Sequence, residues 1–269
     1  MRGPFGAALW TGVFAVLLTA LVSGVWSGLL VLNLMTTPAI PWSALAMAAI
    51  LWALWSWMGG LWGPVQSREA RRSLLRAISL SRGTFALAVA AGICCDIALA
   101  GLWIVIGDLT RVPGNATPDF SRYPLFTVIV TLAMASISGG VSEEAGFRGY
   151  FQGTLEKSLP APLAILICAV VMAPEHAMTQ GFVLPTMAFY LLVDIMLGTS
   201  AALTKSILPG IVTHAIGLLI FFALVWPADK TRALGAAPDP WFWIHAGQVA
   251  VFGAAGILLF LRLAKPRTA

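Results

Sequence analysis

The sequence predicts an all-α integral membrane protein, a polytopic helical bundle with about eight transmembrane helices. Of its 269 residues, 59% are hydrophobic and only 10% are charged, whereas a soluble globular protein carries roughly 25% charged residues. The mean hydropathy of +0.89 also indicates a membrane protein rather than a soluble enzyme. Apolar runs of about 20 residues, the length that crosses a bilayer as a helix, recur along the whole chain. We therefore expect a single membrane domain over residues 1–269.

Each expected span is bounded by a recognisable signal. The first is too long for the apolar core of a signal peptide, and the second begins after the turn signal Thr36-Thr37-Pro38. The fourth becomes more polar towards its end, where Pro160 and Pro162 separate it from the fifth. The expected spans cover residues 5–32, 42–62, 84–106, 124–156, 160–178, 184–203, 207–226 and 241–263.

The distribution of Lys and Arg predicts the orientation. With a cytoplasmic N-terminus, eleven of the 16 basic residues fall in inner loops and four in outer loops, as the positive-inside rule requires. We therefore expect both termini in the cytoplasm. The arginine-rich segment from Ser67 to Arg82 is either a helix on anionic headgroups or a basic connecting loop. No aromatic stacking platform accompanies these arginines, so the net charge of +5 does not indicate nucleic-acid binding.

Three ionisable residues lie inside the fourth span, where an unpaired charge costs about 2.5–3.5 kcal/mol at mid-membrane. They are Glu143, Glu144 and Arg148. On an α-helix, Glu144 and Arg148 are four residues apart and share one face, whereas Glu143 is rotated by about 100° and points at a different neighbour. We expect Glu144 to pair with Arg148 and Glu143 to stay free for chemistry.

Two histidines can complete a site with Glu143. His176 ends the fifth span and His214 lies within the seventh. A carboxylate and two imidazoles that converge in a membrane can bind a divalent metal or activate a water, but a structural polar network and an ion pathway remain alternatives. Asp96 and Asp194 are also carboxylates within spans; each could line the cavity, but we favour structural hydrogen bonding for both.

The residues from Glu143 to Gly149 read EEAGFRG, which resembles the EExxxR motif of the CAAX protease and bacteriocin-processing (CPBP) family of intramembrane endopeptidases. That family includes the type II CAAX prenyl endopeptidases. His176 matches the histidine of its FxxxH motif, with Met172 at the Phe position, and His214 matches the next histidine. The resemblance covers about residues 125–224, which we interpret as the catalytic core.

The resemblance implies an endopeptidase that hydrolyses a peptide bond of a membrane-associated or CAAX-like protein. Glu143 would act with His176 to activate a water, and His214 would stabilise the oxyanion or bind a metal. Glu144 would pair with Arg148 and hold the helix. The family's site opens towards the cytoplasm, so we expect the same here, with a peptide or protein substrate and the lipid bilayer as partners.

The cofactor stays open at this point. Glu143, His176 and His214 match the inventory of a catalytic zinc site with one open position, so they are candidate ligands of a divalent metal such as Zn²⁺. A metal-independent mechanism that uses only glutamate and histidine is equally compatible with the sequence.

One position departs from the family pattern. Leu218, four residues after His214, stands where the family usually has Asn or another polar residue that helps to hold the oxyanion. Thr213 and the neighbourhood of Asp194 are possible replacements. Without one, the chain is a catalytically degenerate member that acts as a membrane scaffold or immunity protein. An ion-coupled transporter is less favoured, because paired halves with interrupted helices are absent from the sequence.

Overall fold

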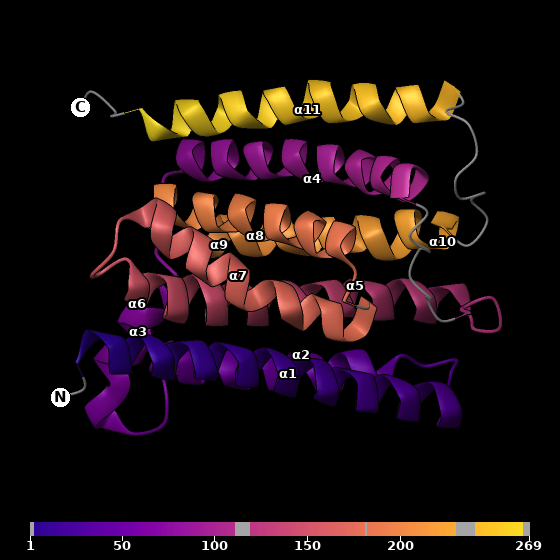
Figure 1. Ribbon diagram of the computed structural model, residues 1–269. Coiled ribbons are helices and arrows are strands. Elements are labelled where there is room, and N and C mark those ends of the chain that lie inside the picture. Colours follow the sequence, from indigo (N-terminus) through magenta and orange to yellow (C-terminus); the bar gives the residue numbers. More distant parts are fainter. Residues whose placement is uncertain (1–2, 111–118, 181, 230–239, 266–269) are drawn as a thin grey trace.

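The computed structural model describes residues 3–110, 119–180, 182–229 and 240–265, and in these ranges the chain is a bundle of long helices without strands (Figure 1). The π-helical segments η2 and η3 continue α5 and α9. The elements are α1 (Pro4–Thr36), α2 (Trp42–Met58), η1 (Val65–Ser67), α3 (Arg68–Leu75), α4 (Arg82–Thr110), α5 (Leu125–Glu143), η2 (Glu144–Gln152), α6 (Gly153–Leu155), α7 (Ala161–Gln180), α8 (Leu184–Thr204), α9 (Leu208–Ile220), η3 (Phe221–Val225), α10 (Trp226–Asp229) and α11 (Pro240–Ala264).

The helices confirm the predicted all-α polytopic membrane protein. Every predicted span corresponds to a helix whose ends agree within a few residues, because apolar length is what the bilayer selects. In the described ranges, six helices are long and apolar enough to cross a membrane. Two shorter apolar helices, Trp42–Met58 and Ala161–His176, account for the other predicted spans. The number of eight transmembrane helices is therefore not established.

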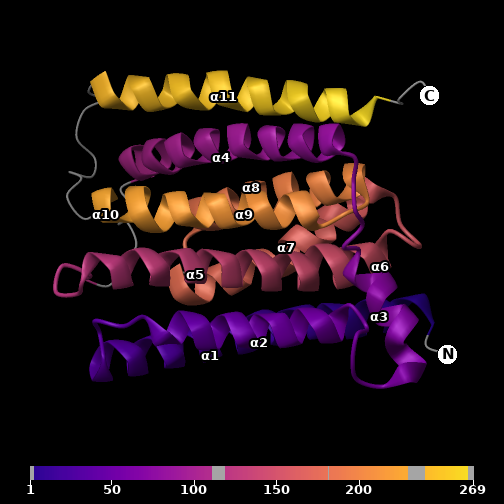
Figure 2. The same ribbon diagram turned by 180° about the vertical axis from the view of Figure 1, so that it is seen from behind.

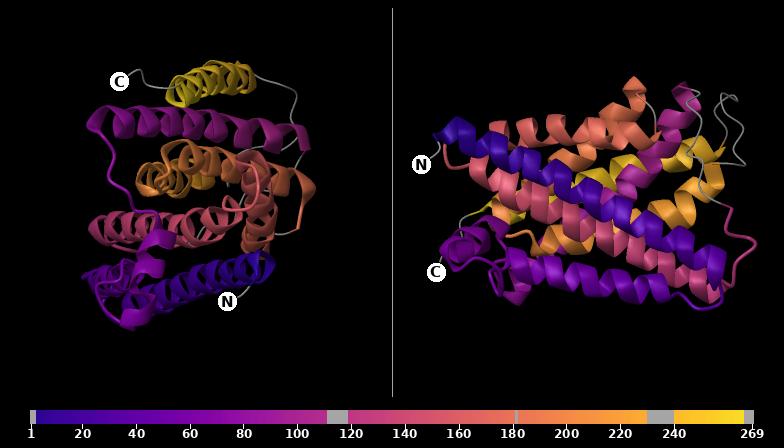
Figure 3. Two further views of the ribbon diagram at one scale, coloured as in Figure 1. Left: turned by 90° about the vertical axis from the view of Figure 1, so that its left-hand side faces the viewer. Right: turned by 90° about the horizontal axis from the view of Figure 1, so that it is seen from below.

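The helices form layers that place α5 and α9 at the centre. α11 packs on α4, α4 packs on α8 and α9, and α9 packs on α5, while α1 and α2 cover the other side of α5 (Figures 1 and 3). The aromatic rings of η2, Phe147 and Phe151, pack with Ala15 of α1 and with Cys168 and Met172 of α7. The segment that carries the glutamate motif is thus enclosed by neighbours.

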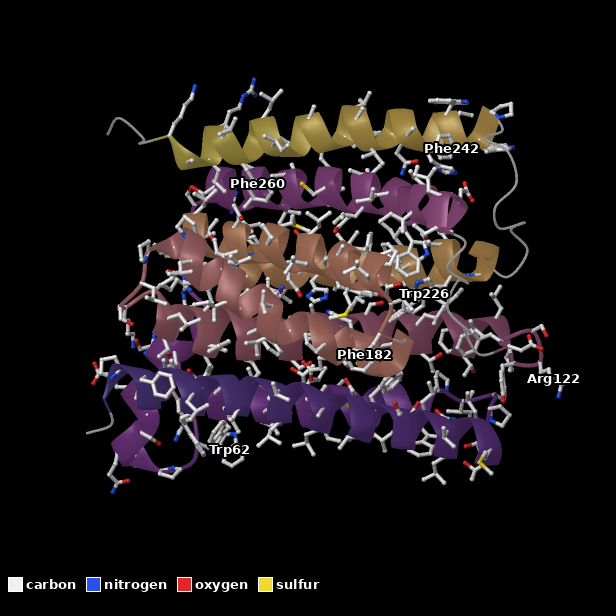
Figure 4. The ribbon with its side chains drawn as sticks, in the orientation of Figure 1. Trp62, Arg122, Phe182, Trp226, Phe242 and Phe260 are labelled. Carbon is white, nitrogen blue, oxygen red and sulfur yellow. The ribbon has the colours of Figure 1, made fainter. Side chains whose placement is uncertain are left out.

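The α7–α8 hairpin is shorter than the rest of the bundle. Its turn stops well before the end at which α5 begins (Figures 1 and 3). Phe182, in this turn, lies between Trp62 at one end of the molecule and Arg122 at the other (Figure 4). Beyond this turn, α1 and α5 are not covered by the α7–α8 hairpin.

Part of the arginine-rich segment forms the short helix α3. Arg71 of α3 is buried, and its guanidinium donates to the carbonyls of Trp57, Trp62 and Pro64 and lies over the Trp57 ring. These bonds dock α3 against the end of α2 (Figure 2). Neither sequence interpretation predicted that the charge of Arg71 is used inside the protein.

Arg76 joins four elements at the same end. It adopts a left-handed backbone conformation after α3, with φ 55°, and its guanidinium donates to the carbonyls of Arg148 and Ala201. It also pairs with Glu156 at 3.3 Å, and Lys205 pairs with the same carboxylate oxygen at 3.1 Å. Burial acts to raise the pKa of Glu156, but the hydrogen bond from Gln152 and the charges of Arg76 and Lys205 outweigh it and lower that pKa.

Acidification should therefore loosen this end of the bundle. A carboxylate whose pKa is lower in the folded state contributes stability above its unfolded pKa and loses it as the pH falls through the folded pKa. We expect the Tm of the detergent-solubilised protein to fall as the pH drops below about 5. Glu156→Gln should lower the Tm near neutral pH and reduce this acid dependence. Glu69→Gln, on the exposed face of α3, is the control, and an acid dependence unchanged by Glu156→Gln would contradict the assignment.

Candidate active site

The glutamate motif lies on a π-helical segment rather than on the α-helix assumed from the sequence. Glu143 is the last residue of α5, and Glu144 and Arg148 belong to η2. All nine residues of η2 are buried. π-Helical turns are rare and concentrate at functional sites. The wider turn does not prevent the expected pair, because Glu144 Oε1 lies 3.5 Å from Arg148 Nε.

Arg148 is the centre of a buried charge network. Its guanidinium donates through Nη2 to Asp194 Oδ1 of α8 at 2.6 Å, in addition to the contact with Glu144. Nη1 contacts the Met172 sulfur at 2.8 Å. Asp194 is thus a structural partner, as favoured from the sequence, although its link to Arg148 was not foreseen. Two carboxylates from two elements balance one cation that is only 1% exposed.

His214 of α9 lies between the two glutamates. Its Nδ1 is 3.2 Å from Glu144 Oε1, and its Nε2 is 3.4 Å from Glu143 Oε2. Glu143 therefore faces a neighbour other than Arg148, but the sequence did not show that Glu144 also contacts this histidine, so that the two carboxylates lie at opposite nitrogens of one ring. Polar contacts therefore link Arg148, Glu144, His214 and Glu143 in one continuous network.

His176 reaches the same site from α7. Its ring stacks on Tyr190 of α8, with 4.2 Å between the centroids and 14° between the planes. His176, His214 and Glu143 all line one cavity of about 780 Å³. The structure thus brings together the carboxylate and both imidazoles, whereas Glu144 and Arg148 lie behind them, fully buried.

Two further carboxyl groups line the cavity, of which the sequence indicated Asp96 as a candidate. Asp96 of α4 and Glu175 of α7 line it together with the residues above. Most of the other lining side chains are apolar or carry hydroxyl groups. They are Val16, Thr19, Ala20, Ser23, Ser27, Leu30, Leu99, Phe120, Thr131, Leu132, Ala135, Met172, Phe189, Tyr190, Val193, Leu197, Gly217, Leu218, Phe221, Phe222 and Trp226.

Leu218 lies where the family pattern would place a polar side chain. An ideal Cβ on Gly139 would lie 2.7 Å from Leu218 Cδ1 and 3.5 Å from Glu143 Oε1, so the leucine methyl and the Glu143 carboxylate both lie near Gly139. The two replacements considered from the sequence are engaged elsewhere. Thr213 packs against Gly92 of α4, and Asp194 is paired with Arg148.

The candidate ligands do not form a metal site as they are arranged. Among the described residues, no group of three or more His, Cys, Asp or Glu side chains is placed to hold a metal ion. Glu143 and His214 are close to each other, but the His176 ring lies against Tyr190. The donor types suit Zn²⁺, yet the geometry does not, so no step below uses a metal.

The cavity extends away from the arginine-rich end. Along α1 its lining runs from Val16 to Leu30, and at the far end it includes Thr131 and Trp226. This is the end that the short α7–α8 hairpin leaves uncovered (Figure 4). The orientation predicted from the basic residues places this end on the outer side of the membrane. A cavity that opens here would therefore not open to the cytoplasm, although the family resemblance implies that it does.

Residues 125–220 match the family model described as "Type II CAAX prenyl endopeptidase Rce1-like". The match includes all five candidate catalytic residues and Leu218, and it confirms the resemblance inferred from the motifs. No curated protein and no solved structure matches the chain.

Labelling from each side of the membrane tests the direction of the cavity. In a background in which Cys94, Cys95 and Cys168 are replaced by alanine, Ser27→Cys should react with a membrane-impermeant maleimide from the side opposite to Lys205→Cys. Intact cells and inverted vesicles provide the two sides. Labelling of both positions from the same side would show that the cavity opens at the arginine-rich end.

Gly210 tests how tightly the glutamates and His214 are held. A Cβ at Gly210 would collide with Glu144 Oε2, and Glu144 cannot yield, because it is fully buried between Arg148 and His214. We expect Gly210→Ala to cost about 1–3 kcal/mol of stability, as overpacking does, and to lower the Tm in detergent. Gly24→Ala on α1, where a Cβ meets open space, is the matched control. Equal Tm values for the two variants would mean that Glu144 is not fixed.

Proposed function

We propose that this integral membrane protein, whose residues 125–220 belong to the type II CAAX prenyl endopeptidase family, is an intramembrane endopeptidase. Glu143 beside His214 Nε2, in a cavity within membrane-spanning helices, is the observation that supports the proposal most strongly. A carboxylate next to an imidazole can activate a water and return its proton. The apolar walls of the cavity lower the local dielectric constant, which strengthens electrostatic interactions in the site.

Glu143 is the general base in the proposed mechanism. It accepts a proton from a water whose oxygen attacks the scissile carbonyl carbon, and the carbonyl oxygen becomes an oxyanion. His176 across the cavity, and His214 when both of its ring nitrogens are protonated, are the imidazoles that can donate N–H groups to this oxygen. The tetrahedral intermediate then collapses, the C–N bond breaks, and the proton carried by Glu143 passes to the leaving amine.

The buried network orients the reacting groups. Glu144 accepts a hydrogen bond from His214 Nδ1, which directs Nε2 towards Glu143. Arg148 and Asp194 hold Glu144 in turn. Partners of this kind keep a catalytic ring in one tautomer and one orientation. Arg148 and Glu144 are therefore positioning residues in this proposal.

A degenerate family member is the second candidate function. Leu218 places a methyl group near Gly139, to which the Glu143 carboxylate also lies close, at the position where a polar side chain is expected. Loss of one oxyanion donor costs about 2.7–4 kcal/mol of transition-state stabilisation. A chain without a replacement would bind a membrane peptide and cleave it slowly or not at all, and so act as a scaffold.

Peptide cleavage by the purified protein distinguishes the two functions. We expect wild-type protein in detergent to cleave members of a library that contains prenylated and unprenylated peptides. Glu143→Gln and His214→Ala should lose at least about 10²-fold in kcat, as expected when a general base or its partner is removed, and His176→Ala should also lose activity. His245→Ala, on α11 and bonded to Gln248, is the matched histidine control.

Two results would overturn the enzyme assignment. Cleavage that persists in both Glu143→Gln and His214→Ala would remove the proposed base and its partner. Binding of peptides by the wild-type protein without cleavage of any of them would favour the scaffold function.

A further inference from the structure

Asp96 is a buried carboxyl group that faces the candidate active site. It lies in the middle of α4, is only 5% exposed, and lines the same cavity as Glu143 and His214. A carboxylate at mid-membrane costs about 2.5–3.5 kcal/mol on insertion scales. Its position therefore needs a functional or a structural explanation.

Two close approaches between α4 and α9 place this carboxyl group. Gly92 of α4 faces Thr213, and Gly217 of α9 faces Asp96, whose Oδ1 would lie 2.9 Å from a Cβ at that glycine. Thr213 and Gly217 flank His214 along α9. Asp96 is thus held against the turn of α9 that follows His214, and it lines the same cavity as Leu218.

The hydrogen bonding of Asp96 differs from that of the other buried aspartate. Asp194 pairs with Arg148 at 2.6 Å. Asp96, by contrast, has no ion-pair partner among the described residues, while the Oδ2 atoms of both aspartates are buried there without a hydrogen-bond partner. An unsatisfied buried polar atom costs about 1–3 kcal/mol, so such exceptions call for a specific cause. The structural hydrogen bonding favoured for Asp96 from the sequence is therefore not what holds this oxygen.

We propose that Asp96 supplies the polar group that Leu218 lacks, by donating a hydrogen bond from its protonated carboxyl group to the oxyanion of the tetrahedral intermediate. This inference rests on the proposed endopeptidase function. A carboxylic acid in an apolar site can remain neutral and act as a donor. Asp96 keeps its proton throughout, because it donates a hydrogen bond and transfers nothing. The donor then comes from α4 across Gly217 instead of from α9.

The proposal is tested by removing the polar group at Asp96 of α4 and introducing one at Leu218 of α9. Asp96→Ala should lower kcat by about 10²–10³-fold with little change in KM, the loss measured for one oxyanion donor. Asp96→Asn retains an N–H donor and should stay within about tenfold of wild type. Leu218→Asn in the Asp96→Ala background should restore most of the lost kcat. Asp108→Ala, at the end of the same helix, is the control.

Thermal stability separates this role from a structural one without an activity assay. An unsatisfied carboxyl group kept for function destabilises the fold, so Asp96→Leu should leave the Tm unchanged or raise it. A structural residue would instead lower the Tm on this change. A lower Tm, or full activity of Asp96→Ala in an active wild-type background, would overturn the role of Asp96 alone. Inactive wild-type protein would overturn the proposed function and this role together.

Discussion

A single buried guanidinium sets the arrangement of the central helices. Arg148 lies inside a membrane-spanning helix and is 1% exposed, so its charge must be balanced by protein groups rather than by water. Asp194 and Glu144 provide that balance from α8 and η2. Because Glu144 also contacts His214 of α9, the requirement to neutralise one cation fixes three elements around one point. Removal of one partner would leave an uncompensated buried charge, which is strongly destabilising.

Packing of the helices around Arg148 and Glu144 depends on glycine residues. Gly149 of η2 faces the carbonyl oxygens of Leu74 and Leu75, at 3.1 and 2.9 Å from an ideal Cβ. Gly210 leaves room for the Glu144 carboxylate. Membrane helices associate closely where small residues let their backbones approach. The polar network and the glycines therefore act together, since charged side chains reach one another only where helices come close.

The sequence predicts the helices of this protein better than it predicts its site. The spans follow from apolar length, which is a local property, and the Glu144–Arg148 pair follows from spacing within one segment. The π-helical turn at Glu144, the contact of His214 with both glutamates, and the pairing of Arg148 with Asp194 depend on how separate helices pack. A carboxylate in an apolar span signals that a partner or a cavity exists, but only the fold distinguishes Asp194, which has a cation, from Asp96, which faces the cavity.

The comparison of Asp96 with Leu218 shows why a motif is an incomplete description of an active site. Reacting atoms respond to a donor at the right place, and the helix from which it comes has no effect on its chemistry. In this chain the expected position on α9 is apolar, while a carboxyl group from α4 lies across Gly217 from it. A change from polar to apolar at one motif position therefore does not by itself indicate lost activity. Activity depends instead on whether a neighbouring helix, brought close by small residues, presents a polar group to the same part of the cavity.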